Sequence, residues 1–186
     1  MVDEALVERA RAGDEEAFSG LARSVGDRLL AIAFRITRDL GLAEDAVQQT
    51  LIGAWNDLPD LRDARAFDAW MYRLLVHACY RELRRNRRWN ASVRVVPLDG
   101  RIEVDGAVSV IARDQLERGF RRLPPEQRAV FVFHHYLGLS LPEVADALGV
   151  PLGTVKSRMH YAVSALRASL EADLRSPIES TSERPA

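Results

Sequence analysis

Residues 154–167 carry side chains of the types and spacing needed to read base edges in DNA. On a helix, one face of this segment would present hydroxyls, rings and positive charge. Such groups donate and accept hydrogen bonds at base edges, and the major groove admits an α-helix that carries them. The pattern therefore indicates binding to double-stranded DNA through Ser157, His160, Tyr161 and Ser164, flanked by Lys156 and Arg167.

Two helices joined by a short turn are expected to position this face. Ser140 and Glu143 form a capping box that starts the first helix. Gly149 ends that helix because glycine tolerates positive φ, residues 150–153 make the turn, and Thr154 caps the second helix. An ordinary helical hairpin is the alternative interpretation. The buried positions follow helical spacing: Leu141, Val144, Ala145 and Leu148, then Val155, Met159, Ala162, Val163, Leu166 and Leu170.

A second set of basic and aromatic side chains, the aromatic–basic stripe, follows one face of a helix predicted over residues 66–89. Arginines contact phosphates and aromatic rings stack on unpaired bases, a combination that suits single-stranded or melting nucleic acid. The alternative is a solvated basic helix end, which the helix dipole favours. That effect explains Arg87 and Arg88 better than Arg73. The stripe consists of Trp70, Arg73, His77, Arg81, Arg84 and Arg88, with Tyr80 beside it.

A helix predicted over residues 43–58 carries a candidate protein-binding surface, the Ile52 patch. Ile52 lies among amides and a carboxylate, and an isoleucine at the centre of a polar face is typical of a contact surface. A single exposed apolar residue is the ordinary alternative. The patch consists of Asp45, Gln49, Ile52 and Asn56, with Gln48 at its edge. The side of this helix that is expected to be buried consists of Val47, Leu51, Ala54, Trp55 and Leu58.

The sequence gives little support for an enzyme. It contains no HExxH, CxxC, Walker or GxSxG pattern. His134 and His135 are adjacent, so on a helix they point about 100° apart and make a poor metal pair. We expect them at the edge of the core, and we expect no catalytic residue, metal or cofactor.

Composition and charge favour a protein with one anionic partner and one protein partner. The 186 residues are 47% hydrophobic and have a formal net charge of −1, but residues 81–94 are strongly basic and residues 1–20 are acidic. The single cysteine, Cys79, excludes an internal disulfide and is expected to be a buried filler. No segment has the length and composition of a membrane span or a signal peptide, so we expect a cytoplasmic protein without membrane insertion.

Helical periodicity dominates, which predicts an all-α fold of two small helical domains joined by a flexible linker. In the first domain, helices are expected to start at Asp14 and to cover about 27–38, 43–58 and 66–89. Pro97, Gly100 and Gly106 interrupt the pattern, and the valines of this segment suit at most a short strand. The predicted division is a domain at 1–89, a linker at 90–112, a helix-turn-helix domain at 113–175 and a disordered tail at 176–186.

Four motifs, in this order and spacing, resemble a bacterial RNA polymerase sigma factor of the extracytoplasmic-function (ECF, sigma-70 group 4) family. The resemblance covers about residues 8–172. The first domain resembles sigma region 2 and the second resembles sigma region 4. The motifs are AEDAVQQTLIGAW at 43–55, AFDAWMYRLL at 66–75, LPPEQR at 123–128 and GTVKSRMH at 153–160.

The resemblance implies core RNA polymerase, through its β′ clamp helices and β flap, and promoter DNA as partners, with an anti-sigma factor as a further candidate. The polymerase contacts would be Asp45, Gln48, Gln49, Ile52 and Asn56. The −10 element would be held and opened by Asp60, Arg62, Asp63, Arg65, Trp70, Arg73, His77, Tyr80, Arg81, Arg84 and Arg88. The −35 element would be read by Thr154, Lys156, Ser157, Arg158, His160, Tyr161 and Ser164.

Two positions depart from the family pattern, so the promoter sequence is not carried over. Tyr161 stands where many members have arginine, and Asp60 stands where some have an amide. The rival interpretation is a helix-turn-helix regulator that acts without the polymerase core. It explains residues 123–170 but leaves the aromatic–basic stripe without a role.

Overall fold

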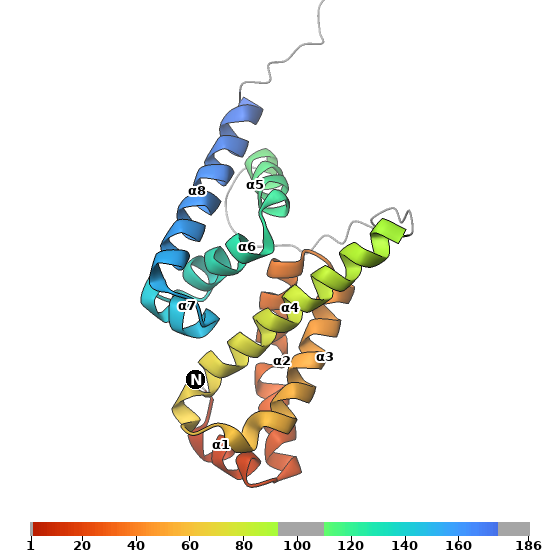
Figure 1. The fold of residues 1–186 in the computed structure, drawn as a ribbon, viewed down its shortest axis with the longest axis vertical. Helices are drawn as coiled ribbons and strands as arrows, with labels where there is room; N and C mark the ends of the chain where they lie inside the picture. The colour runs from red at the N-terminus through yellow and green to blue at the C-terminus, as the bar shows by residue number, and fades with distance from the viewer. Residues whose placement is uncertain (1, 93–109, 175–186) are drawn as a thin grey trace, which may run out of the picture.

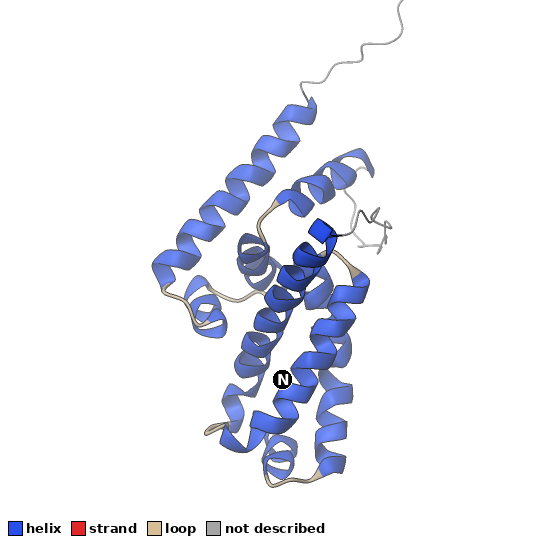
Figure 2. Ribbon diagram, turned by 45° about the vertical axis from the view of Figure 1, so that its right-hand side comes forward, coloured by secondary structure: helices blue, strands red, loops and turns tan. Residues whose placement is uncertain are grey.

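The computed structural model describes residues 2–92 and 110–174, and these form helices, turns and loops without a strand (Figures 1 and 2). The predicted all-α fold is therefore confirmed. The first part contains α1 (Glu4–Arg11), α2 (Glu15–Thr37), α3 (Leu40–Asp57), the 3-10 turns η1 (Leu58–Asp60) and η2 (Ala64–Ala66), and α4 (Phe67–Ser92). The second contains α5 (Val110–Arg122), α6 (Pro125–Phe131), a π-helical turn η3 (Val132–Tyr136), α7 (Leu141–Leu148) and α8 (Leu152–Leu174).

Helices α2, α3 and α4 run side by side and α1 lies across one end of this bundle (Figure 1). Aspartates start the first three helices, because each side chain accepts a backbone N–H that the first turn leaves unpaired. Asp3 accepts from Ala5, Asp14 from Ala17 and Asp39 from Leu42. The interior is apolar, with Leu29, Ile32, Ile36, Met71 and Leu75 fully buried.

Several boundaries in this bundle differ from the prediction. Helix α1 was not expected, and the helix expected at 27–38 is the second half of α2. Gly26 lies inside α2, where glycine costs about 1 kcal/mol relative to alanine. Val25 and Leu29 on either side of it are fully buried, and burial of such side chains, at about 1.5–3 kcal/mol each, outweighs that cost.

The buried side of α3 was also partly wrong. Trp55 was expected in the core, but it is 39% exposed and meets Phe18 edge-on, with ring centroids 5.0 Å apart. The residues that α3 buries are mostly small: Ala43, Ala46, Thr50 and Ala54. Small side chains let α3 pack closely against its neighbours, which leaves the indole at the rim.

Helix α4 is buried on two faces. Phe67, Met71, Leu75 and Ala78 pack inside the first bundle, while Tyr72, Val76 and Cys79 are buried on another face. That second face meets the second domain, since α4 packs beside α7 and the rings of Tyr72 and Phe133 lie 5.4 Å apart in a T-shaped pair. The two domains therefore share one hydrophobic core.

The helix-turn-helix forms as the local signals predict, with one exception. Glu143 Oε2 accepts from the backbone N–H of Ser140 at 2.8 Å while Ser140 Oγ accepts from that of Glu143, which completes the capping box. Gly149 ends α7 at a φ of 65°. The prediction that Thr154 caps the next helix is wrong: α8 begins at Leu152, and the Thr154 N–H already donates to Pro151 O at 2.9 Å.

The helices on either side of the predicted linker are longer than expected. Helix α4 continues to Ser92 and α5 begins at Val110, so both enter the range 90–112. The valine segment and the predicted tail at 176–186 lie outside the described residues.

Replacing Ser140 by alanine is expected to lower the free energy of unfolding by about 0.5–2 kcal/mol, because the first turn of α7 loses its side-chain acceptor. Urea unfolding of the full chain measures the change. Ser19→Ala, at an exposed site inside α2, is the control and should change stability little. Equal effects of the two substitutions would show that the capping box does not stabilise the domain.

Candidate polymerase and promoter interfaces

The Ile52 patch is exposed on α3. Asp45, Gln48, Gln49 and Asn56 are exposed around Ile52, whose own side chain is 50% exposed. Trp55 lies on the same face, three residues from Ile52, and belongs to this surface although it was predicted to be buried. The i, i+3 spacing from Ile52 was the signal that could have found it.

An ion-pair network ties this surface to α4. Arg85 Nη2 lies 3.0 Å from an Asp45 carboxylate oxygen and 2.6 Å from Glu82 Oε2. Glu82 is buried, so Arg85 supplies the charge that stabilises its carboxylate inside the bundle. The arrangement fixes the position of Asp45 at one end of the Ile52 patch. Neither Glu82 nor Arg85 was among the predicted site residues.

The loop between α3 and α4 is held in shape by its own side chains. Leu61 and Ala64 are buried and anchor it. Asp63 accepts hydrogen bonds from the backbone and the guanidinium of Arg65, and the guanidinium bond is the larger cause that lowers the Asp63 pKa. Asp60 and Arg62 are exposed, so the anchored loop presents both to a partner.

The aromatic–basic stripe is exposed along most of α4. His77, Arg81, Arg84 and Arg88 are exposed, whereas Trp70 is half-buried with its ring 6.0 Å from that of Phe67. Tyr80 is half-buried, its hydroxyl is buried without a hydrogen-bond partner, and burial raises its pKa. Arg73 Nη2 donates to the backbone oxygen of Asp146 in α7 at 2.6 Å. The second domain thus engages one edge of the stripe.

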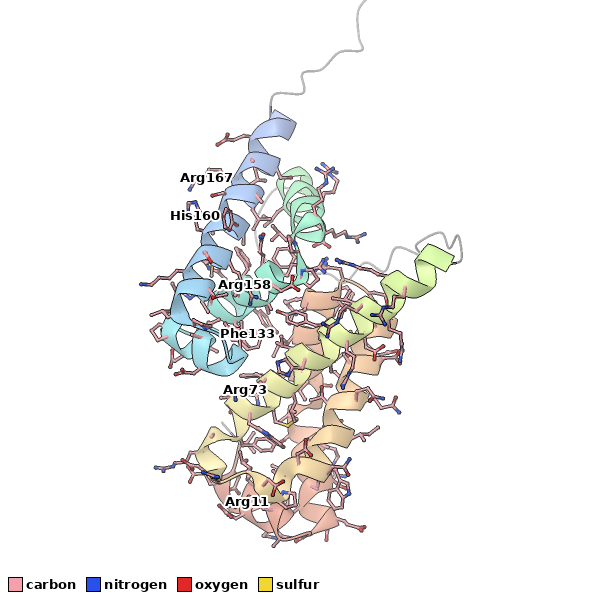
Figure 3. All side chains as sticks on the ribbon, viewed as in Figure 1. Arg11, Arg73, Phe133, Arg158, His160 and Arg167 are labelled. Atoms are coloured by element: carbon pink, nitrogen blue, oxygen red, sulfur yellow. The ribbon has the colours of Figure 1, made fainter. Side chains whose placement is uncertain are left out.

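The predicted recognition face of α8 is open. Lys156, Ser157, His160 and Ser164 are exposed and Tyr161 is 61% exposed, with its ring 5.8 Å from that of His160. Figure 3 shows His160 and Arg167 on the side of α8 that faces away from the first domain. The Ser157 hydroxyl donates to Thr154 O at 3.0 Å, which leaves its lone pairs available as acceptors.

Two residues of the predicted −35 set are less exposed than the rest. Thr154 and Arg158 are half-buried. The charge of Arg158 acts on Tyr80 of α4, where it opposes the effect of burial on the tyrosine pKa. On α8, Arg158 lies three residues before Tyr161 and therefore about 60° from it around the helix, at the edge of the recognition face.

The histidine pair and the cysteine occupy structural positions. His134 Nδ1 lies 2.7 Å from Leu139 O, and His135 is exposed, with its pKa lowered first by partial desolvation and then by His134. Cys79 is fully buried, which raises its pKa to about 12 and confirms the expectation of a buried filler. The described residues contain no cluster of three or more potential metal ligands, and none of their helices is long and apolar enough to cross a membrane.

Comparison with protein families assigns both domains. The model of sigma-70 region 2 matches residues 21–89, and the model of sigma-70 region 4 matches residues 113–166. The ECF RNA polymerase sigma factor SigL of Mycobacterium tuberculosis is 35% identical over 167 residues, which cover 86% of this chain and 94% of the relative. SigW of Bacillus subtilis is 26% identical over 176 residues, 88% of this chain and 94% of the relative.

Two solved structures have a fold similar to that of this chain. The structure of CnrH in complex with the cytosolic domain of CnrY matches 92% of this chain and 98% of its own, with 26% identity and a TM-score of 0.65. The sigma factor RpoE of Bartonella quintana, in complex with the anti-sigma factor NepR, matches 84% of this chain and 98% of its own, with a TM-score of 0.67 at 24% identity.

The matches to sigma-70 regions 2 and 4 thus define a sigma-70-type transcription initiation factor. The chain belongs to the extracytoplasmic-function family of RNA polymerase sigma factors. It acts as an alternative sigma factor, which binds core RNA polymerase and directs promoter recognition and the start of transcription. Sigma factors are initiation factors and not enzymes. The region 2 match and the relatives named as sigma factors do not favour a regulator that acts without polymerase.

Proposed function

We propose that each exposed surface serves one step of initiation. The Ile52 patch binds the β′ clamp helices of core polymerase, and the second domain meets the β flap. The loop 60–65 and the aromatic–basic stripe hold the opened −10 element, and the exposed face of α8 reads the −35 element. The observation that carries this proposal is the separation of the Ile52 patch on α3 from a basic face on α4 and a hydrogen-bonding face on α8.

The predicted division of the chain follows the same functions. Residues 1–89 bind core and open DNA, residues 113–175 read the upstream element, and residues 90–112 connect them. We infer that the protein works in the cytoplasm, where its polymerase is. The structural relative RpoE is seen with an anti-sigma factor, and we propose such a factor as a further partner here. Pull-down of core polymerase followed by run-off transcription on a genomic library tests the whole assignment.

Ile52→Arg is expected to weaken binding to core polymerase by about 2 kcal/mol, the size of an interface hot spot, because a charge would be desolvated at the centre of the contact. A core-binding titration measures the loss. Leu40→Arg is the matched control, since Leu40 is an exposed apolar residue of α3 on a different face from Ile52. Unchanged affinity of Ile52→Arg, with an intact fold, would remove the proposed role of the patch.

Lys156→Ala is expected to cost about 1–3 kcal/mol on a cognate promoter, as for the loss of one good base contact. Binding to cognate and scrambled −35 duplexes gives the comparison, and Arg122→Ala, on an exposed arginine of α5, is the control. A loss that is equal on both duplexes, with a salt slope reduced by about one, would instead assign Lys156 to phosphate contact.

Trp70→Ala is expected to lower open-complex formation on duplex promoters roughly tenfold, because stacking of a base on an aromatic ring is worth about 1–3 kcal/mol. A pre-melted bubble template should largely restore activity, since the cost of base extrusion has then been met. Permanganate footprinting of promoter thymines measures both. Trp70 also packs beside Phe67. Equal loss on both templates, with a lowered melting temperature, would mean that the ring serves only the core.

A further inference from the structure

Helix α1 lies outside the part of the chain that the region 2 model matches. That match begins at residue 21, whereas α1 covers Glu4–Arg11. The helix has 8 residues, and isolated helices shorter than about 12–15 residues are only marginally stable in water. Its stability therefore comes from the elements that it packs against, and these elements indicate what the helix does.

Helix α1 packs against both turns that frame the loop 60–65. The turn η1 leads into this loop and η2 leads out of it. Helices α3 and α4 also pack on these turns, but they are the direct neighbours of the turns in the chain. Of the helices that the structure describes, α1 is the one distant in sequence that packs closely on both turns, at the end of the bundle where α3 gives way to α4 (Figure 1).

The hydrogen bonds of the loop are all local. The Leu61 N–H donates to Leu58 O at 3.1 Å, the Ala66 N–H donates to Asp63 O at 3.0 Å, and Asp63 accepts from Arg65. Bonds between residues two or three apart fix the shape of the loop, but they do not fix its position against the bundle. That position has to come from buried side chains.

The buried side chains of α1 and of the loop belong to one core. Helix α1 buries Val7 and Ala10, while Leu61 and Ala64 anchor the loop, and all four are part of the same hydrophobic cluster. Close-packed side chains transmit a shift of one element to its neighbour. A displacement of α1 is therefore expected to move the loop, although α1 itself need not touch DNA.

The first turn of α1 also acts on the charge of the loop. The pKa of Arg65 is raised first by its hydrogen bond to Asp63 and then by the charges of Asp63 and of Glu4, which lies on α1. Glu4 thus lies within electrostatic reach of Arg65, one of the proposed −10 contacts. The charge and the packing independently place α1 beside the loop.

The packing of α1 on α2 is incomplete at one point. A hollow of about 240 Å³ between the two helices is lined by Val2, Asp3, Leu6, Ser24 and Arg28. Gly20 of α2 lies beside Leu6, since a Cβ added at Gly20 would be 3.5 Å from Leu6 Cδ2, an ordinary van der Waals distance. An alanine at this position would add a contact that holds α1 more firmly.

We infer that α1 is the element that positions the loop 60–65 for reading the −10 element, with Val7 and Ala10 as positioning residues. They act through Leu61 and Ala64, and so determine where the exposed loop residues Asp60 and Arg62 meet an opened strand. The inference rests on the proposed role of this loop. It extends the DNA-reading part of the first domain to a helix that precedes the matched region.

A pair of equivalent substitutions tests the inference. Val7→Ala and Val25→Ala each remove two methyl groups from a valine that is 1% exposed, so both should lower the melting temperature by similar amounts. Val25 is on α2, which is not among the helices that pack closely on the two turns. Core-bound factor is mixed with pre-melted promoter templates whose opened −10 segment is randomised, and the bound templates are sequenced. Val7→Ala should lower the preference for the favoured base about fivefold, part of what one good base contact provides, and Val25→Ala should leave it unchanged.

A rescue experiment separates positioning from stability. Gly20→Ala, added to Val7→Ala, should restore most of the base preference because it holds α1 through Leu6. Gly26→Ala is the matched control: it lies in the same helix and gains the same helix propensity, but an added Cβ there meets nothing within 4 Å. It should raise the melting temperature without restoring the preference.

Each other outcome contradicts a particular step. Equal losses of preference in Val7→Ala and Val25→Ala, or equal rescue by Gly20→Ala and Gly26→Ala, would show that α1 contributes stability alone and would overturn the inference. An unchanged preference in Val7→Ala would do the same. A wild-type holoenzyme without any base preference in the opened segment would contradict the proposed role of the loop itself, and the inference would fall with it.

Discussion

The face of α4 that carries Tyr72, Val76 and Cys79 is apolar and must be covered, and this requirement organises both domains. Helices α2 and α3 pack against α4 inside the first bundle, and Arg28 of α2 reaches the ring of Tyr72, 5.5 Å from its centroid. Phe133, from the π-helical turn η3, meets Tyr72 and extends a single core across the junction. The exposed stripe of α4 is what remains after two faces have been buried, so its position is a consequence of packing as much as of its own charges.

A buried charge lowers the stability of the packing between the two domains. Arg128 is buried with its Nε unpaired, and one of its terminal nitrogens reaches only the carbonyl of Arg121, at 3.3 Å. A buried guanidinium without a carboxylate partner costs free energy that water would recover on separation. The apolar contact of Tyr72 with Phe133 works in the opposite direction.

Local signals in the sequence were sufficient where structure is decided within a few residues. Ser140 with Glu143 and the positive φ of Gly149 depend on short-range hydrogen bonds and sterics, and both predictions are confirmed. The predictions failed where distant packing decides. Gly26 continues a helix because its neighbours are buried, and Trp55 is displaced to the surface by the alanines beside it. Nothing in the period of α4 indicates that Tyr72 meets the second domain.

The same distinction between local signals and distant packing applies to the residues of the candidate site. Amphipathic spacing placed the Ile52 patch and most of the α8 face correctly on the surface, because each is a property of one helix. Arg73, Tyr80 and Arg158 owe their surroundings to the other domain, which no single helix reveals. With the two domains packed together, the Ile52 patch and Tyr161 remain exposed. Contacts through these two surfaces therefore require no separation of the domains, whereas the Tyr80 hydroxyl is buried and lies within electrostatic reach of Glu126 and Arg158 from the second domain.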